Sequence, residues 1–287
     1  MSTYPCSQCG TLLTPSETVC KTCGRRAEPR QLADTSYAQP LRPKKGPNIG
    51  MLIGVGVLLL VLIGGGVLLL AGGKKALTQG ATSKNILAAV GTASAMQPLF
   101  ADMFADNSKG WTLGAGATIS DHALTLANAN QNSFVNTFLP TGNPFGDFLL
   151  KVSLNIEQGD QNDYIGLSLR TDSNFNHEYH VLLSPDQKFE IGKIYVDSSN
   201  KMQEKPLVAN TNSSALNPIG QQNMVAVVMK GDHLILIINN TVVESISDSD
   251  YTSGQIALYI YHGNTSNGVK ASFTNVSVYP APDQLPS

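Results

Sequence analysis

The sequence predicts a mainly β protein in which two antiparallel sheets pack as a sandwich, preceded by a small cysteine-rich module and one apolar helix. All four cysteines lie within the first 23 residues, an uncharged apolar run follows at residues 49–71, and short β-rich runs separated by turns fill the chain beyond residue 99. Only 14% of the 287 residues are charged, which is unlike the composition of a protein built from amphipathic helices.

The four cysteines form two C-x-x-C-G knuckles, with Cys6 and Cys9 in the first and Cys20 and Cys23 in the second. Two such knuckles supply the four soft ligands that Zn²⁺ prefers in a closed, tetrahedral structural site. We therefore expect structural zinc, whose binding would supply the folding energy of this short module. The segment resembles the zinc ribbons at the N-termini of many bacterial membrane proteins. Two disulfides would require an oxidising compartment, and a redox pair would require a βαβ pattern that is missing here.

The apolar run is long enough to cross a membrane. At ~1.5 Å per residue, a helix over residues 49–71 spans about 34 Å, compared with about 30 Å of hydrocarbon. The run is too long for the core of a cleaved signal peptide, so we expect an uncleaved anchor. Gly50 and Gly54 form a G-x-x-x-G that could pair two such helices, although glycine is common in membrane helices.

Flanking charge predicts the orientation of this helix. More Lys and Arg residues precede the run than follow it, and zinc-bound thiolates persist most readily in a reducing cytosol. We therefore predict a single-pass cell-membrane protein with a cytoplasmic N-terminus and an extracytoplasmic C-terminal domain. The net charge of −2 gives no reason to expect a nucleic-acid partner.

Beyond a small, polar stalk, the pattern changes to period two. Runs such as FLLKVSLNI, YIGLSLR and QIALYIY are typical of strands, and no convincing helix separates them. HLILIINNTVVESI predicts a hairpin whose turn is Asn239–Asn240, because asparagine tolerates positive φ. The sole tryptophan, Trp111, is expected in the core.

The order of these runs resembles the concanavalin A-like jelly roll, in particular its laminin-G-like and 3-keto-disaccharide hydrolase types. Asp102, Phe104 and Trp111 in FADMFADNSKGWTL match an opening D-x-F…G-W, and SGQIALYIYHG…VKASFTNVSVY matches a closing G-x-I-x-L…F-x-N-V-x-V. Two features depart from the pattern: Gln222 stands where a Trp usually precedes Asn223, and Asn-Asn replaces the usual Asn-Gly turn. The resemblance implies the fold, but the fold hosts lectins, enzymes and adhesion modules alike.

The sequence shows no catalytic motif. Glycoside hydrolysis usually requires two carboxylates about 5–9.5 Å apart, and the E-x-D-x-x-E run of laminarinase-like relatives is absent. The acidic stretch EQGDQND is typical of a solvated turn. Glu178 lies beside His177 and His180, but residues i and i+3 of a strand face opposite sides. We therefore expect the domain not to be an enzyme.

A ligand-binding face is the more plausible site. If Ile165, Leu167 and Leu169 face the core, alternation places their neighbours on the other face of the sheet, where sugars can stack on aromatic rings. The alternative is that tyrosine and arginine have no binding role and are present because they suit a half-exposed strand. The candidate ligand-binding residues are Tyr164, Arg170, His180, Tyr259 and Tyr261.

Calcium is a second candidate cofactor. Asp248 and Asp250, or Asp102 and Asp106, could supply the oxygen ligands that Ca²⁺ prefers. Ordinary solvated loop acids are the alternative interpretation.

We predict a membrane-anchored surface protein whose external jelly roll binds a polysaccharide or another cell-surface ligand. A glycoside or keto-sugar hydrolase on the same fold is one alternative. A non-sugar adhesion or signalling tether, whose zinc ribbon docks a cytosolic partner, is another. The expected domains are a zinc ribbon (1–27), a cytosolic linker (28–47), a transmembrane helix (48–73), a stalk (74–98), the β-sandwich (99–280) and a tail (281–287).

Overall fold

The chain divides into two compact units, Met1–Pro43 and Lys44–Ser287. The computed structural model describes residues 4–5, 12–14, 82–264 and 267–285.

The first unit contains a short two-stranded sheet, in which β1 (Tyr4–Pro5) pairs antiparallel with β2 (Leu12–Leu13). The four predicted zinc ligands, at positions 6, 9, 20 and 23, lie outside the described residues. The zinc ribbon therefore stays a prediction.

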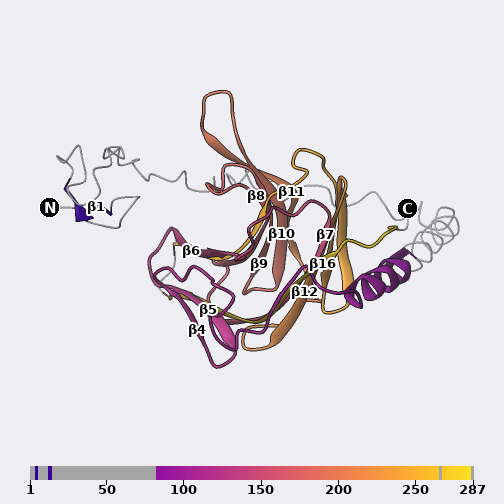
Figure 1. Cartoon of the computed structure of the whole chain (residues 1–287), viewed down its shortest axis with the longest axis horizontal. Coiled ribbons are helices and arrows are strands. Elements are labelled where there is room, and N and C mark those ends of the chain that lie inside the picture. The colour runs from indigo at the N-terminus through magenta and orange to yellow at the C-terminus, as the bar shows by residue number, and fades with distance from the viewer. Residues whose placement is uncertain (1–3, 6–11, 15–81, 265–266, 286–287) are drawn as a thin grey trace, which may run out of the picture. The chain divides into compact units, whose positions relative to one another are not determined.

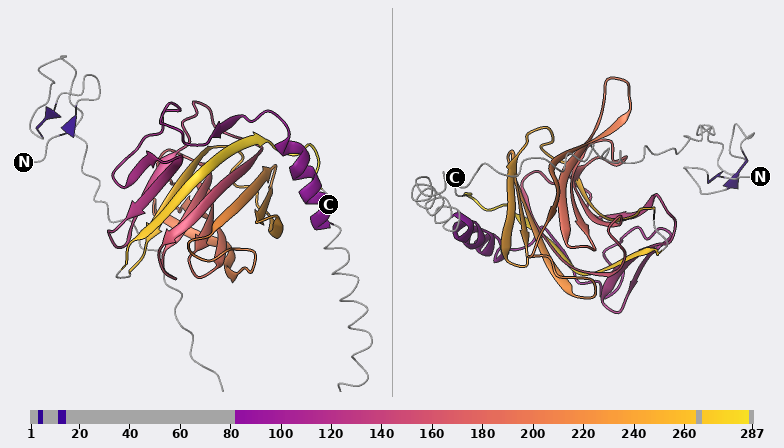
Figure 2. Two further views of the ribbon diagram at one scale, coloured as in Figure 1. Left: turned by 90° about the horizontal axis from the view of Figure 1, so that it is seen from below. Right: turned by 180° about the vertical axis from the view of Figure 1, so that it is seen from behind.

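The second unit is an antiparallel β-sandwich of two sheets, as the alternating sequence predicts (Figure 1, Figure 2). The six-stranded sheet contains, in spatial order, β11 (Met202–Asn212), β10 (Lys188–Val196), β9 (Glu178–Ser184), β8 (Tyr164–Thr171), β15 (Gln255–His262) and β6 (Ser133–Phe138). The eight-stranded sheet contains β14 (Thr241–Ser247), β13 (His233–Ile238), β12 (Gln222–Lys230), β7 (Phe148–Gln158), β16 (Val269–Pro280), β5 (Ala123–Asn128) and β4 (Ala117–Ser120), and β3 (Phe100–Asp102) pairs with β16.

The core lies between the two sheets because apolar side chains alternate along the strands. In β7 the inward positions Val152, Leu154 and Ile156 are buried, while the intervening residues are half-buried. Leu167 of β8 and Leu258 of β15 are fully buried in the same core. Burying each such side chain contributes about 1.5–3 kcal/mol, so the period-two pattern fixes which face of each sheet turns inward.

A helix over residues 82–94 covers part of the outer face of the eight-stranded sheet (Figure 1, Figure 2). Its buried residues Ile86, Val90 and Ala93 recur at helical spacing and pack in one cluster with residues such as Val228 and Ile235. The helix lies within residues 74–98, which the sequence predicts to be a stalk. Burial against this helix explains why β12 and β13 carry apolar residues at consecutive positions.

The predicted membrane localisation is corrected by the structure. Among the residues that the structure describes, no helix is both long and apolar enough to cross a membrane. The run on which the prediction depends, residues 48–73, lies outside those residues. Nothing in the structure therefore supports the predicted single-pass anchor.

Two local predictions are confirmed. β13 and β14 form the predicted hairpin, and Asn239 and Asn240 both adopt positive φ at its turn (47° and 64°). Trp111 is 3% exposed and packs in the core, where its indole N–H donates to Asp102 Oδ2 over 2.7 Å. This bond satisfies the one polar atom of a buried indole.

Candidate functional site

The candidate site lies on the face of the six-stranded sheet that points away from the core. Alternation along the strands turns Ser168, His180 and Tyr259 to this side, opposite the core residues Leu167 and Leu258. Pairing aligns these strands: His180 lies opposite Ser168 on β8, and Tyr259 lies opposite Gly166. Residues from these three neighbouring strands can therefore meet on one surface.

Two glycines make room for ring side chains on this face. A Cβ atom at Gly166 would lie 2.1–2.6 Å from three atoms of the Tyr259 ring. A Cβ at Gly192, which pairs with His180, would lie 2.3 Å from His180 Nε2. Each ring therefore lies directly over the backbone of the neighbouring strand, in a position that only glycine there permits.

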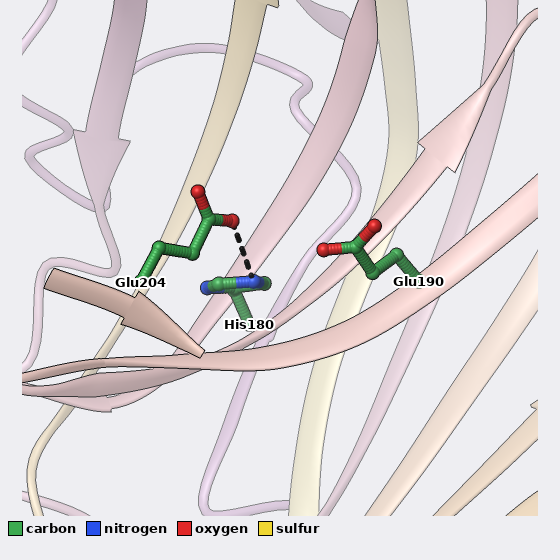
Figure 3. Close-up of side chains that lie close together, drawn as sticks. All are labelled: His180, Glu190 and Glu204. Atoms are coloured by element: carbon green, nitrogen blue, oxygen red, sulfur yellow. Dashed lines mark ion pairs between the residues drawn. The ribbon is translucent and has the colours of Figure 1, made fainter. Parts of the chain in front are cut away.

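His180 is the centre of a cluster of carboxylates. Its side chain is 2% exposed, with Nδ1 3.7 Å from Glu178 Oε1 and Nε2 3.4 Å from Glu204 Oε1. Glu190 lies nearby, and its carboxylate also points toward the imidazole (Figure 3). Oxygens of Glu190 and Glu204 and one nitrogen of His180 all lie within 4.8 Å of one another. We call Glu178, His180, Glu190, Glu204 and Tyr259 the His180 cluster.

The cluster perturbs the pKa of three of its members. Burial lowers the pKa of His180, but the nearby carboxylate of Glu178, and then the charges of Glu204 and Glu190, outweigh it and raise the pKa overall. Burial and the charge of Glu204 raise the pKa of Glu190. Burial, together with the charges of the three glutamates, raises the pKa of Tyr259 well above 10. Such coupled perturbations are typical of functional sites.

Several buried polar atoms of this face have no hydrogen-bond partner among the described residues. They are both ring nitrogens of His180, Oε2 of Glu178 and Oγ of Ser168. Buried polar atoms are nearly always hydrogen-bonded, and each unsatisfied one costs about 1–3 kcal/mol. Four such atoms beside one another are suited to hold a bound molecule or ion that supplies the missing partners.

The structure brings four of the five predicted ligand-binding residues to this face. His180 and Tyr259 belong to the cluster, and Tyr164 and Tyr261 pair across β8 and β15 with their rings stacked 6.4 Å apart. The charges of Glu190 and Glu204 contribute to raising the pKa of Tyr164, after burial, which is the larger cause. Tyr261 lies two residues from Tyr259 on β15 and therefore on the same face of the sheet, so the tyrosine pair lies beside the cluster.

Arg170 does not join this group. Its guanidinium is buried and donates to the carbonyl oxygens of Gly146, Gly231 and Tyr251, and to Asp147 Oδ1. These partners come from loops on three parts of the fold. Arg170 therefore links three loops at the end of the sandwich through hydrogen bonds.

The aspartates considered for calcium have protein partners. Asp248 and Asp250 both accept hydrogen bonds from the buried ammonium of Lys193. Asp102 accepts from the Trp111 indole and from the Phe104 amide. The set of described residues best suited to a metal ion is instead His180, Glu190 and Glu204.

Sequence reasoning missed most of the cluster. Glu178 was considered only together with both neighbouring histidines, of which His177 faces Asp172 in a loop. The spacing of Glu178 and His180 was the available signal, because residues i and i+2 of a strand share a face. Glu190 and Glu204 carry no local signal, since only the pairing of β9, β10 and β11 brings them to His180.

The fold is a carbohydrate-binding or glycosidase-like β-sandwich. Residues 97–279 match the 3-keto-alpha-glucoside-1,2-lyase-like domain, and the chain belongs to this family. No curated protein matches the chain.

Solved structures are similar to the chain at low sequence identity. A protein of unknown function with a galectin-like fold from Bacillus subtilis is 14% identical, with a TM-score of 0.50 over 66% of this chain and 98% of that one. The carbohydrate-binding module CBM66 from Bacillus subtilis is 15% identical, with a TM-score of 0.47 over 60% and 97% of the two chains. LamAcat from Zobellia galactanivorans is 13% identical, with a TM-score of 0.48 over 65% and 99%.

Family membership corrects the expectation that the domain is not an enzyme. That expectation rested on the absence of a local sequence motif. The matching family is named for a lyase, and the His180 cluster supplies acid–base groups that no local motif reveals. The domain is therefore a candidate enzyme.

Proposed function

We propose that the β-sandwich binds a 3-keto-α-glucoside at the His180 cluster and cleaves it by elimination across C1 and C2. The observation that carries the proposal is the buried cluster itself, in which three carboxylates, an imidazole and a phenol gather around unpartnered polar atoms. The family description supports the choice of substrate and bond, since it names a 3-keto-alpha-glucoside and a 1,2-lyase.

The proposed reaction needs one proton acceptor and one proton donor. A ketone at C3 acidifies the hydrogen on C2, and a base removes that hydrogen as a proton. The electron pair left on C2 forms a double bond to C1 as the bond from C1 to the glycosidic oxygen breaks. A donor then protonates the departing oxygen, so no water is consumed. Groups positioned for such proton transfers typically contribute about 10²–10⁴ in rate.

Two members of the cluster fit these roles. Glu178 Oε2 is buried without a hydrogen-bond partner, so it is available to accept the C2 proton. The Tyr259 ring lies over Gly166, and the charges of all three glutamates act on its hydroxyl, which can donate to the departing oxygen. Both groups are held on rigid strands, as a catalytic geometry requires.

The stacked tyrosines provide a binding surface for the sugar beside these groups. Tyr164 and Tyr261 lie side by side on neighbouring strands, and Phe134 of β6 pairs with Tyr261 in the same cross-strand row. Phe134 is 37% exposed and the two tyrosines are half-buried, so their rings are accessible. Sugar rings bind to such rows by stacking their apolar faces on aromatic rings.

The experiment follows release of p-nitrophenol from its 3-keto-α-glucoside by the full chain, with an unsaturated keto-sugar as the expected co-product. Glu178→Gln and Tyr259→Phe are each expected to slow release by about 100-fold or more. Glu157→Gln is the matched control, because Glu157 pairs with Lys270 on the other sheet and should leave release unchanged. Equal rates in all four proteins, or no release by the wild type, would contradict the proposal.

A further inference from the structure

We propose that His180, Glu190 and Glu204 bind a divalent transition-metal ion. The three side chains come from β9, β10 and β11, and their candidate ligand atoms all lie within 4.8 Å of one another. Figure 3 shows the carboxylates of Glu190 and Glu204 both directed toward the imidazole. This inference names a cofactor for the site of the proposed function and rests on that proposal only for the role of the metal.

The buried imidazole is the observation that points to a ligand. His180 is 2% exposed at its side chain, and neither ring nitrogen has a hydrogen-bond partner among the described residues. Its Nε2 faces Glu204 Oε1 at 3.4 Å, which is too long for a good hydrogen bond. A metal ion between Nε2 and the carboxylates would satisfy a nitrogen that the protein alone leaves unsatisfied.

The second nitrogen is oriented as metal-binding histidines usually are. Nδ1 faces Glu178 Oε1 at 3.7 Å, and both side chains are 2% exposed. Metal-bound histidines commonly direct their other ring N–H to a carboxylate, which fixes the tautomer and raises the basicity of the ligand. Glu178 is therefore a positioning residue for the metal as well as the proposed proton acceptor, using a different oxygen for each role.

The charge of the site also favours a cation. Glu178, Glu190 and Glu204 converge there, and no lysine or arginine forms an ion pair with any of them within the described part of the chain. Carboxylates this close repel one another unless a proton or a cation compensates them. A divalent ion offsets two of these charges.

The donor set selects the class of metal. One imidazole and two carboxylates suit Mn²⁺, Fe²⁺ or Zn²⁺, whereas Ca²⁺ and Mg²⁺ prefer oxygen alone. Metal–ligand distances of about 2.0–2.2 Å require the two glutamates to draw slightly closer to the imidazole. Glu204 has this freedom because its side chain is 33% exposed. When bound, such an ion could polarise the ketone oxygen of a keto-sugar.

The site can be tested with Mn²⁺ alone, without any sugar. Mn²⁺ is the probe because thiolates bind it weakly, so the four cysteines of the first unit should not compete. Electron paramagnetic resonance of free Mn²⁺, titrated against the metal-stripped full chain, should show one tight site. His180→Gln and Glu204→Gln should each abolish that site, and Glu178→Gln should weaken it by about 10- to 100-fold. Glu244→Gln, on edge strand β14, is the matched control and should bind as the wild type does.

Far-UV circular dichroism checks that each variant is folded. Glu204→Gln keeps the test decisive if His180→Gln does not fold, because Glu204 is partly exposed on edge strand β11. Absence of tight Mn²⁺ binding by the wild type, or equal binding by the wild type and Glu204→Gln, would overturn the metal site. Neither result depends on sugar cleavage, so failure of this inference and failure of the proposed function are distinguishable.

Discussion

Replacing Gly192 by alanine tests the geometry of the cluster most sharply. The new Cβ would lie 2.3 Å from His180 Nε2, 2.9 Å from its Cε1 and 3.2 Å from the carbonyl oxygen of Lys205. Ordinary contacts begin near 3.4 Å, so the buried imidazole must move by about 1 Å. Overpacking of this kind costs about 1–3 kcal/mol.

The assay is urea denaturation of the full chain, followed by circular dichroism. With a denaturant dependence of about 2 kcal/mol per M, a loss of about 2 kcal/mol lowers the midpoint by about 1 M. Gly192→Ala should also weaken Mn²⁺ binding, because Nε2 leaves its place between the carboxylates.

The matched control is Gly114→Ala, since no atom lies within 4 Å of a Cβ at that position. Its effect on the free energy of unfolding should stay within about 0.5 kcal/mol. If Gly192→Ala had the stability and Mn²⁺ affinity of the wild type, the imidazole would not lie over Gly192 and the description of the site would be wrong.

Three further predictions concern the fold. Ile86→Ala should lower the free energy of unfolding by about 2–4 kcal/mol in urea denaturation, because Ile86 is 4% exposed on the buried face of the helix over residues 82–94; equal loss in the exposed-site control Lys84→Ala would contradict the packing. Arg170→Met should cost about 3 kcal/mol, because it leaves three carbonyl oxygens without their donor; a thermal midpoint unchanged from the wild type would refute this role. Burial and then the hydrogen bond to Asp248 raise the pKa of Tyr179 from 10.0 to about 12. A raised folded-state pKa adds stability that is complete below about pH 10 and is lost toward pH 12. In alkaline denaturation, the stability advantage of the wild type over Tyr179→Phe should therefore shrink across that interval. A constant difference would count against the hydrogen bond.

Alternation along single strands was enough to predict much of the sandwich and part of the site. The buried positions of β8 and β15 follow the period-two pattern, which is why Tyr164, Tyr259 and Tyr261 share one face with His180. The hairpin at Asn239–Asn240 was predictable because its turn chemistry is local.

Alternation fails at Arg170 for a structural reason. The pairing of β8 with β15 shifts register between Gln255 and Ala257, opposite this part of β8, and Arg170 itself adopts a φ of 50°. A bulge with positive φ redirects the side chain. The guanidinium consequently bonds to loop carbonyls at the end of the sandwich, although simple alternation predicted that it would face the ligand.

The acidic half of the site could not be predicted from the sequence. Glu190 and Glu204 lie in unremarkable strand sequences, and they reach His180 only through the long-range pairing of β9, β10 and β11. The roles of Gly166 and Gly192 could not be predicted either, because each accommodates the ring of a side chain from a neighbouring strand. The helix over residues 82–94 was missed although its signal is local: Ile86, Val90 and Ala93 recur at helical spacing, but residues 74–98 were predicted to be a stalk.

Proton exchange at C2 of a 3-keto-α-glucoside in D₂O, followed by NMR, tests most directly whether the His180 cluster performs sugar chemistry. With Mn²⁺ present, the full chain should exchange the C2 hydrogen for deuterium or yield the C1–C2 unsaturated product, and Glu178→Gln should do neither at a comparable rate. A C2 position that keeps its hydrogen while the glycoside stays intact, in a folded and Mn²⁺-loaded protein, would contradict the account.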